Sequence, residues 1–213
     1  LASNLGWMLP EYLVGPENET LRYLFGDRSL GHLEQLSPIV FYGDKEVGKT
    51  ALSITLAVSW ARSTSLRPLC ITSGRSFVAD FSAAVEIDDL DSFRSRHRAC
   101  KLLLIDDLEA LAQASASQNE LVSTLDVLAE LGRPVIVTLN RLPSTIAGLN
   151  SALTSRLSGG FSVPLLKPRP ATLEKLVPAL ILTIDRKLPA VPLVELCVRL
   201  SAKNLSVPDV HKV

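Results

Sequence analysis

The chain has 213 residues, which is enough for one large domain or for one domain with a small appendage. Hydrophobic residues make up 47% and charged residues 21%, a composition that predicts a packed core and argues against disorder. The formal net charge is zero, so the chain lacks the basic excess of a dedicated duplex-DNA binder. Three scattered cysteines without metal-type spacing indicate a reducing compartment. No run of about 18 apolar residues exists, so we expect no membrane span.

Short apolar runs alternate with helical patterns along the first three quarters of the chain. Nearly continuous apolar runs are typical of strands buried on both faces, and their alternation with helices favours βαβ units with right-handed crossovers. We therefore expect an α/β fold with a five-stranded parallel sheet. The predicted strands are residues 38–42, 68–72, 101–105, 134–139 and 161–165, and the predicted helices are residues 50–62, 75–85, 88–98 and 118–131.

The pattern changes after Leu166. Residues 167–170 (KPRP) are typical of a linker turn, and residues 172–185 and 191–201 predict helices without intervening strands. We therefore divide the chain into a nucleotide-binding base domain, residues 1–166, and a small helical lid, residues 167–213, which is incomplete at its end.

One motif predicts a triphosphate site. The segment Gly43-Asp44-Lys45-Glu46-Val47-Gly48-Lys49-Thr50 matches G-x-x-x-x-G-K-[ST], between a predicted strand and a helix that continues at Ala51. The glycines let backbone N–H groups approach phosphate oxygens, Lys49 would reach the β- and γ-phosphates, and Thr50 would ligate Mg²⁺. The alternative is a turn that matches the motif by chance.

A pair of carboxylates supports the same prediction. Asp106 and Asp107 end the apolar run that starts at Lys101. A phosphate-loop protein needs an acidic residue at the end of such a strand to hold Mg²⁺, and Asp106 takes this role. Asp107 would orient or deprotonate the attacking water. The alternative is that the pair caps the following helix.

With these motifs in place, nearly the whole chain resembles the AAA+ module of the bacterial replication initiator DnaA family. The resemblance rests on the following segments: residues 13–18 (LVGPEN), 77–81 (FVADF), 93–98 (FRSRHR), 137–143 (VTLNRLP) and 153–157 (LTSRL). From Asp106 to Arg156 the match has no gap. It implies an AAA+ three-layer sandwich followed by the helical lid, with ATP or ADP and Mg²⁺ as cofactors.

The resemblance also implies roles for single residues. Asn140 matches the first sensor near the γ-phosphate, with a helix or turn cap as the alternative. Arg156 matches the arginine finger that reaches a neighbouring subunit's nucleotide, with a surface ion pair as the alternative. Gly15 and Asn18 match the contact beside the adenine, with turn formation as the alternative.

Three departures from the family limit what the resemblance implies. Residues 204–206 (NLS) lack the arginine of the second sensor. Residues 113–117 (QASAS) carry none of the basic side chains with which the initiator grips single-stranded DNA. No C-terminal helix-turn-helix domain is expected within this sequence. The basic cluster at residues 94–98 (RSRHR) is best interpreted as a solvated helix face, with phosphate or an acidic partner as the alternative.

Three functions follow. The first is an initiator-type module in the bacterial cytoplasm, which uses ATP binding and slow hydrolysis to control head-to-tail assembly with neighbouring AAA+ subunits. The second is a DnaA-related adaptor that binds nucleotide and docks on another replication protein without gripping DNA. The third is a scaffold that retains ADP and never turns over. In each case we expect at most weak DNA binding by this chain and no contact with a membrane.

Overall fold

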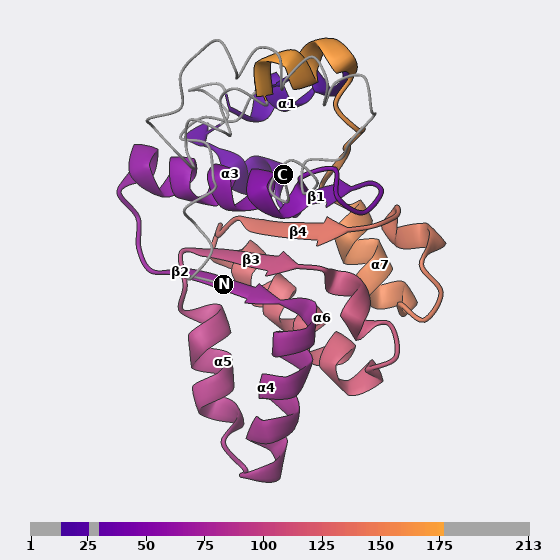
Figure 1. Ribbon diagram of the computed structural model, residues 1–213. Helices are drawn as coiled ribbons and strands as arrows, with labels where there is room; N and C mark the ends of the chain where they lie inside the picture. Colours follow the sequence, from indigo (N-terminus) through magenta and orange to yellow (C-terminus); the bar gives the residue numbers. More distant parts are fainter. Residues whose placement is uncertain (1–13, 26–29, 177–213) are drawn as a thin grey trace, which may run out of the picture.

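The computed structural model describes residues 14–25 and 30–176 of the chain. Five strands form a single parallel sheet in the order β2-β3-β4-β1-β5 (Figure 1). The predicted parallel sheet and all five predicted strands are confirmed. Their bounds are Ile39–Tyr42 (β1), Leu69–Ser73 (β2), Leu102–Asp106 (β3), Val135–Leu139 (β4) and Phe161–Pro164 (β5).

Prolines define where three of the strands begin. Pro38, Pro68 and Pro134 immediately precede β1, β2 and β4, each of which starts one residue later than predicted. Proline has no N–H to donate to a neighbouring strand, although its carbonyl oxygen can still accept. The Pro38 carbonyl accepts from Phe161 N at 3.0 Å, and the Pro68 carbonyl accepts from Lys101 N at 2.7 Å.

Helices cover both faces of the sheet (Figure 1). None of the helices in the described ranges is long and apolar enough to cross a membrane. The longer helices are Lys49–Thr64 (α3), Gly74–Glu86 (α4), Leu90–Arg98 (α5), Ser115–Glu130 (α6) and Ser151–Ser158 (α7). The short ones are Pro16–Asn18 (η2), Leu21–Leu24 (α1), Leu33–Leu36 (η3), Leu108–Leu111 (η4) and Pro143–Thr145 (η5).

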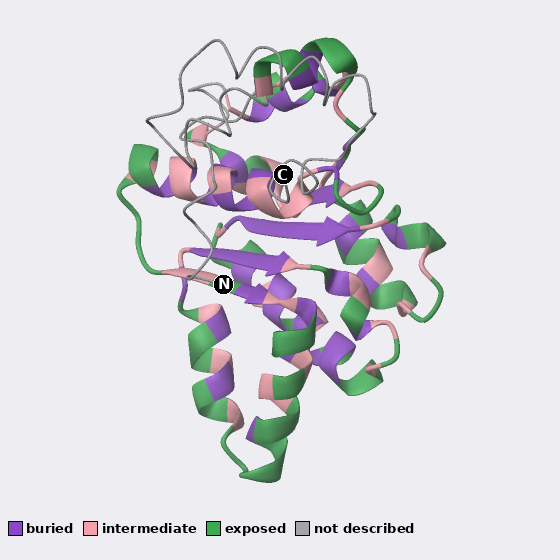
Figure 2. Ribbon diagram, in the orientation of Figure 1, coloured by how far each residue is buried: buried purple, intermediate pink, exposed green. Residues whose placement is uncertain are grey.

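Two apolar clusters sandwich the sheet, and successive strand residues alternate between them. In β3, Leu102 and Leu104 join α3 and α1 in one cluster, while Leu103 and Ile105 pack with α4–α7 in the other. All four of these side chains are buried. This double burial explains the continuous apolar runs in the sequence, and Figure 2 shows the central strands buried along their length.

The strand order determines where a ligand can bind. β1 lies between β4 and β5, and α3 leaves β1 to reach β2 at the far edge of the sheet. Ligands of open α/β sheets bind beyond the carboxyl ends of the strands, where the strand order reverses. Residues 43–48 follow the carboxyl end of β1 and therefore lie where such a ligand would bind.

Side-chain hydrogen bonds fasten the N-terminal segment to the chain that follows β5. The Asn18 amide donates to the Leu166 carbonyl at 3.0 Å and accepts from Leu166 N at 2.9 Å. The Glu17 carboxylate accepts from Arg169 N and from the Thr172 hydroxyl. Residues 170–176 are helical, which agrees with the start of the predicted helix 172–185. The rest of the predicted lid, including residues 191–201 and 204–206, lies outside the described residues.

The basic cluster on α5 is less solvated than the sequence suggested. Arg94 and Arg98 both bind the Glu120 carboxylate on α6, at 2.9 Å and 2.6 Å, and Arg96 binds Asp80 on α4 at 3.0 Å. The face keeps the partial exposure that the sequence predicted, and in addition three α5 cations meet acidic groups on the two helices beside them. The cluster is part of the packing of α5.

His97 occupies the inner face of the same helix. The residue is 1% exposed, its ring packs against Phe77 and Phe93, and its Nδ1 lies 2.8 Å from the Phe93 carbonyl oxygen. Burial lowers the pKa of His97 below its ordinary value of 6.5, because the charged ring would lose its hydration. His97 is therefore a neutral core residue.

This burial predicts a pH-dependent stability. As the pH falls through 6.5, the unfolded chain binds a proton at His97 that the folded chain does not bind, so the free energy of unfolding must decrease. We expect His97→Phe to flatten the decrease between about pH 7 and pH 5 in urea denaturation. Equal slopes for wild type and His97→Phe would contradict the prediction.

Candidate functional site

The loop between β1 and α3 has a backbone that requires glycine at both ends. Gly48 has φ 95°, in the left-handed region, and a Cβ added to Gly43 would collide with the Leu165 carbonyl oxygen. Between them, the buried Val47 side chain anchors the loop in the apolar cluster beneath α3. Since α3 begins at Lys49, the free N–H groups of its first turn face this loop.

The Lys49 ammonium group is surrounded by oxygen atoms. Its Nζ donates to the carbonyls of Gly43 at 2.8 Å and Asp44 at 2.6 Å, and to Asn140 Oδ1 at 3.1 Å. Burial lowers the pKa of Lys49, while the nearby carboxylates of Glu109 and Asp106 oppose this shift. A cation held by a ring of oxygens at a helix N-terminus is suited to bind phosphate oxygens in their place.

Asp106 lies at the end of β3, beside Thr50. Thr50 Oγ1 lies 3.0 Å from Asp106 Oδ1 and 2.9 Å from its Oδ2. A hydroxyl and a carboxylate are the hard oxygen ligands that Mg²⁺ prefers, so the two residues predicted to hold the metal fit it in kind and in position.

Thr138 is a site residue that the sequence analysis missed. It lies in β4 and is almost completely buried. Its Oγ1 donates to Asp106 Oδ1 at 2.6 Å and accepts from Asp107 N at 2.9 Å. The pairing of Ile105 with Val137 brings Thr138 beside Asp106 at the end of the ladder. A polar residue within the apolar run of residues 134–139 was the signal for this role.

Asp107 and Asn140 follow the ends of β3 and β4. Asp107 adopts a left-handed backbone (φ 55°, ψ 59°) and immediately precedes η4, but its side chain makes no capping hydrogen bond. Capping therefore does not explain this carboxylate, which is exposed. The Asn140 side chain accepts from Lys49, so it binds the phosphate loop and does not act as a turn cap.

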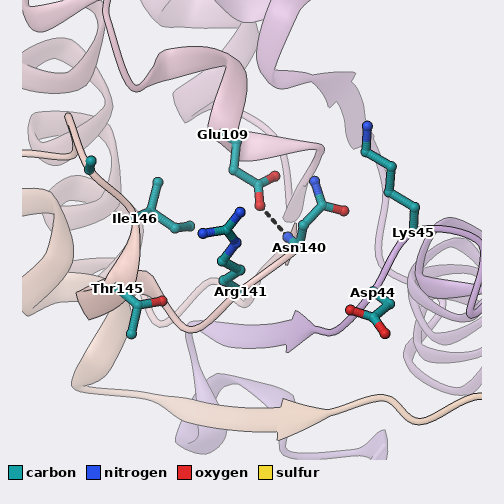
Figure 3. A pocket seen from close by; sticks show the side chains of 8 residues that line it. Asp44, Lys45, Glu109, Asn140, Arg141, Thr145 and Ile146 are labelled. Atoms are coloured by element: carbon teal, nitrogen blue, oxygen red, sulfur yellow. Dashed lines mark hydrogen bonds between the residues drawn. The ribbon is translucent and has the colours of Figure 1, made fainter.

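Glu109 of η4 is the second residue that the sequence analysis missed. Its Oε1 accepts the N–H of Asn140, whereas its Oε2 is buried without a hydrogen-bond partner among the described residues (Figure 3). Burial raises the pKa of Glu109, and the neighbouring Asp107 carboxyl raises it further. Glu109 lines a hollow of about 470 Å³ with Asp44, Lys45 and Asn140, a volume within the range of small-ligand sites.

Arg156 does not join these residues. It lies on α7, where its guanidinium forms two hydrogen bonds with the Asp126 carboxylate on α6, at 2.7 Å and 3.2 Å. The hollow beside it is also lined by Pro38 and Val135, at the amino ends of β1 and β4. Arg156 therefore lies near the amino ends of the strands, whereas the phosphate loop lies at their carboxyl ends.

Gly15 and Asn18 lie near the phosphate loop but have structural contacts of their own. Both polar ends of the Asn18 amide are used by the backbone of Leu166, and a Cβ on Gly15 would collide with Thr172 and the Glu17 carboxylate. Leu165, the neighbour of Leu166, contacts Gly43. The segment is therefore placed beside the loop, with the Asn18 side chain engaged in fastening it.

The sequence profile of the bacterial DnaA ATPase domain matches residues 7–164. The chromosomal replication initiator protein DnaA of Sphingopyxis alaskensis is 31% identical over 161 residues, covering 76% of this chain and 34% of that protein. DnaA of Francisella tularensis subsp. novicida is 26% identical over 162 residues, covering 76% and 33%. The chain thus spans about a third of the length of these curated relatives.

Solved structures show the same fold. Domain III of the Thermotoga maritima replication initiation protein DnaA has a TM-score of 0.80 at 24% identity, covering 91% of this chain and 81% of that one. DnaA from Aquifex aeolicus, bound to AMPPCP, has a TM-score of 0.81 at 24% identity, covering 98% and 64%. From the profile match over most of its length, with the sheet order and phosphate loop in agreement, the chain belongs to the bacterial DnaA ATPase domain family.

Proposed function

We propose that this chain binds ATP with Mg²⁺ at the phosphate loop and acts as the nucleotide-controlled assembly module of a DnaA-like replication initiator. The observation that carries the proposal is the convergence of Lys49, Thr50, Asp106 and Asn140 at one end of the sheet. The AMPPCP bound by the Aquifex aeolicus relative supports a nucleotide at this place. Replication of the chromosome would place the protein in the bacterial cytoplasm.

The phosphates would lie along the loop from Gly43 to Thr50 and against the first turn of α3 at Ala51. Backbone N–H groups of residues 44–48 would surround them, and Lys49 would exchange its carbonyl partners for phosphate oxygens. Thr50 and Asp106 would hold Mg²⁺, which when bound neutralises charge on the β- and γ-phosphates. Gly15 and Asn18 would border the adenine side, and ADP would occupy the same loop after hydrolysis.

Hydrolysis would be slow and would use the residues after β3 and β4. Asp107, exposed at the strand end, would take a proton from the attacking water, and Asn140 would sense the γ-phosphate through its amide. Asn140 already contacts Lys49, so a change at the phosphates can reach β4 directly. We further propose that residues 1–166 form the base domain and that residues 167–213 form the lid.

Arg156 would act on the nucleotide of a neighbouring subunit. Its position near the amino ends of the strands supports this. A contact between that side of one subunit and the phosphate-loop side of an identical subunit is head to tail, and such contacts build rings or filaments. Leaving Asp126 costs little, because both side chains of this ion pair are solvent-exposed and water screens the attraction between them. In the neighbour, the guanidinium would stabilise charge on the transferred phosphoryl group.

A specific observation favours a second candidate, a DnaA-related adaptor that docks on another replication protein. The segment that leads from η4 into α6, residues 113–117, has no lysine or arginine with which to hold DNA phosphates. Single-stranded DNA binding measured at two salt concentrations separates the candidates. Tight, ATP-dependent and salt-sensitive binding would exclude the adaptor.

Removing the phosphate-loop cation tests nucleotide binding. We expect Lys49→Ala to weaken ATP binding by roughly 100-fold in isothermal titration, because it removes the ammonium group that the loop carbonyls of Gly43 and Asp44 hold in place. Lys101→Ala, at the amino end of β3, is the control and should bind ATP like the wild type. Equal ATP affinity for Lys49→Ala and wild type would refute the proposal.

Removing Arg156 tests action between subunits. Arg156→Ala should bind ATP normally but lose turnover by about 10³-fold, together with ATP-dependent assembly in sedimentation experiments. Mixing it with Lys49→Ala should restore phosphate release. In the mixture, the Lys49→Ala subunit supplies Arg156 to the intact phosphate loop of the neighbouring Arg156→Ala subunit. Failure of the mixture to recover turnover, while both variants remain folded, would argue against head-to-tail catalysis.

Replacing the buried threonine of β4 tests the support of the metal site. Thr138→Val keeps the shape but removes the hydroxyl, which leaves Asp107 N without its partner. We expect a loss of about 1–3 kcal/mol in the free energy of unfolding, measured in urea, and weaker Mg²⁺-dependent ATP binding. Thr138→Ser should retain both properties, and unchanged values for Thr138→Val would show that the hydroxyl is dispensable.

A further inference from the structure

Arg141 follows the end of β4 beside the phosphate loop. Its exposed side chain reaches into the hollow that Glu109 also lines (Figure 3). The Glu109 carboxylate is used by the N–H of Asn140, and among the residues that the structure describes no carboxylate forms an ion pair with Arg141. Because Asn140 contacts Lys49, this free guanidinium lies one residue away from the contacts of the phosphate loop.

Asp126 would lose its partner in the proposed head-to-tail contact. Its carboxylate holds the Arg156 guanidinium by two hydrogen bonds, and 45% of its side chain is exposed. Once Arg156 turned to a neighbouring nucleotide, this carboxylate would approach a negative triphosphate without compensation. Arg133 lines the same hollow, but its Nη1 already donates to the carbonyl oxygens of Arg98 and Cys100, at 2.5 Å and 3.1 Å. The contact therefore requires another cation for Asp126.

Arg141 meets this requirement in charge and in geometry. An arginine holds a carboxylate through two parallel hydrogen bonds, which is the arrangement that Asp126 already has with Arg156. Lys45 lines the hollow as well, but an ammonium group is a point charge without this fork, and Lys45 belongs to the loop that would surround the phosphates.

We propose that Asp126 exchanges partners on assembly, releasing Arg156 to the nucleotide of the next subunit and binding Arg141 of that subunit. The inference rests on the head-to-tail assembly proposed above and adds a second pair of residues to the contact. The exchange leaves no charge unpaired, because Arg156 gains the phosphates while Asp126 gains a guanidinium. The hollow beside the phosphate loop is then an interaction surface for a second copy of this chain.

The test reverses the two charges in separate variants. Asp126→Lys sets two cations against each other at every contact, and Arg141→Glu sets two carboxylates against each other. Like charges that meet across an interface are strongly unfavourable, so each variant alone should need at least about 10-fold more protein than wild type for ATP-dependent assembly in sedimentation. An equimolar mixture of the two should assemble like wild type. In alternating order, each contact pairs either the introduced lysine with the introduced glutamate or the native Asp126 with the native Arg141.

Three further variants are controls. Arg141→Gln should assemble less well but bind ATP within about 3-fold of wild type, whereas a cation that held the γ-phosphate of its own subunit would lose ATP affinity with its charge. Arg141→Lys keeps the charge and should assemble better than Arg141→Gln. Arg62→Glu, at the exposed end of α3 away from the phosphate loop, changes the net charge as Arg141→Glu does and should assemble like wild type.

Failure of the mixture to assemble, while wild type assembles, would overturn the inference and leave head-to-tail assembly standing. Wild-type assembly by either charge-reversed variant alone would overturn it too, as would a loss of ATP affinity by Arg141→Gln equal to its loss of assembly. If the wild type itself does not assemble with ATP, the proposed function fails and this inference fails with it.

Discussion

The burial of the parallel sheet on both faces is the constraint on which the rest of the structure depends. Along β3, successive leucines enter opposite apolar clusters, so the middle of the strand has no room for a polar group. Polar functional side chains are then confined to the strand ends, and in a parallel sheet the carboxyl ends of all strands lie on the same side. The phosphate loop, Asp106 and Asn140 come together for this reason, although 97 residues separate Gly43 from Asn140 in the numbering of the chain.

Within that edge, the polar groups are arranged as a connected network. Thr138 joins Asp106 to the backbone of Asp107, Asn140 joins Lys49 to β4, and Glu109 joins Asn140 to η4. A change of ligand at Lys49 can therefore alter contacts at the ends of β3 and β4 and in η4. Such a network is rigid when its hydrogen bonds are satisfied.

The position of Arg156 separates what one subunit contains from what a neighbouring subunit would have to supply. One subunit brings together the parts that would bind a nucleotide, while the residue expected to complete hydrolysis is held by Asp126 at the opposite edge. The DnaA structures of Thermotoga maritima and Aquifex aeolicus share the fold described here. An assembly that supplies Arg156 in trans would make turnover depend on the neighbour, which is the property a switch for assembly requires.

The sequence by itself determined the five strands, the phosphate loop from Gly43 to Thr50 and the polar residues at the strand ends. These features are local, because an apolar run or a glycine with a special backbone angle is visible in adjacent residues. Thr138 and Glu109 were not predicted, since their roles arise from strand register and from contacts between residues about 31 positions apart. Only the tertiary structure likewise placed His97 among aromatic rings and Arg156 on Asp126, because packing between helices decides which face of each is buried.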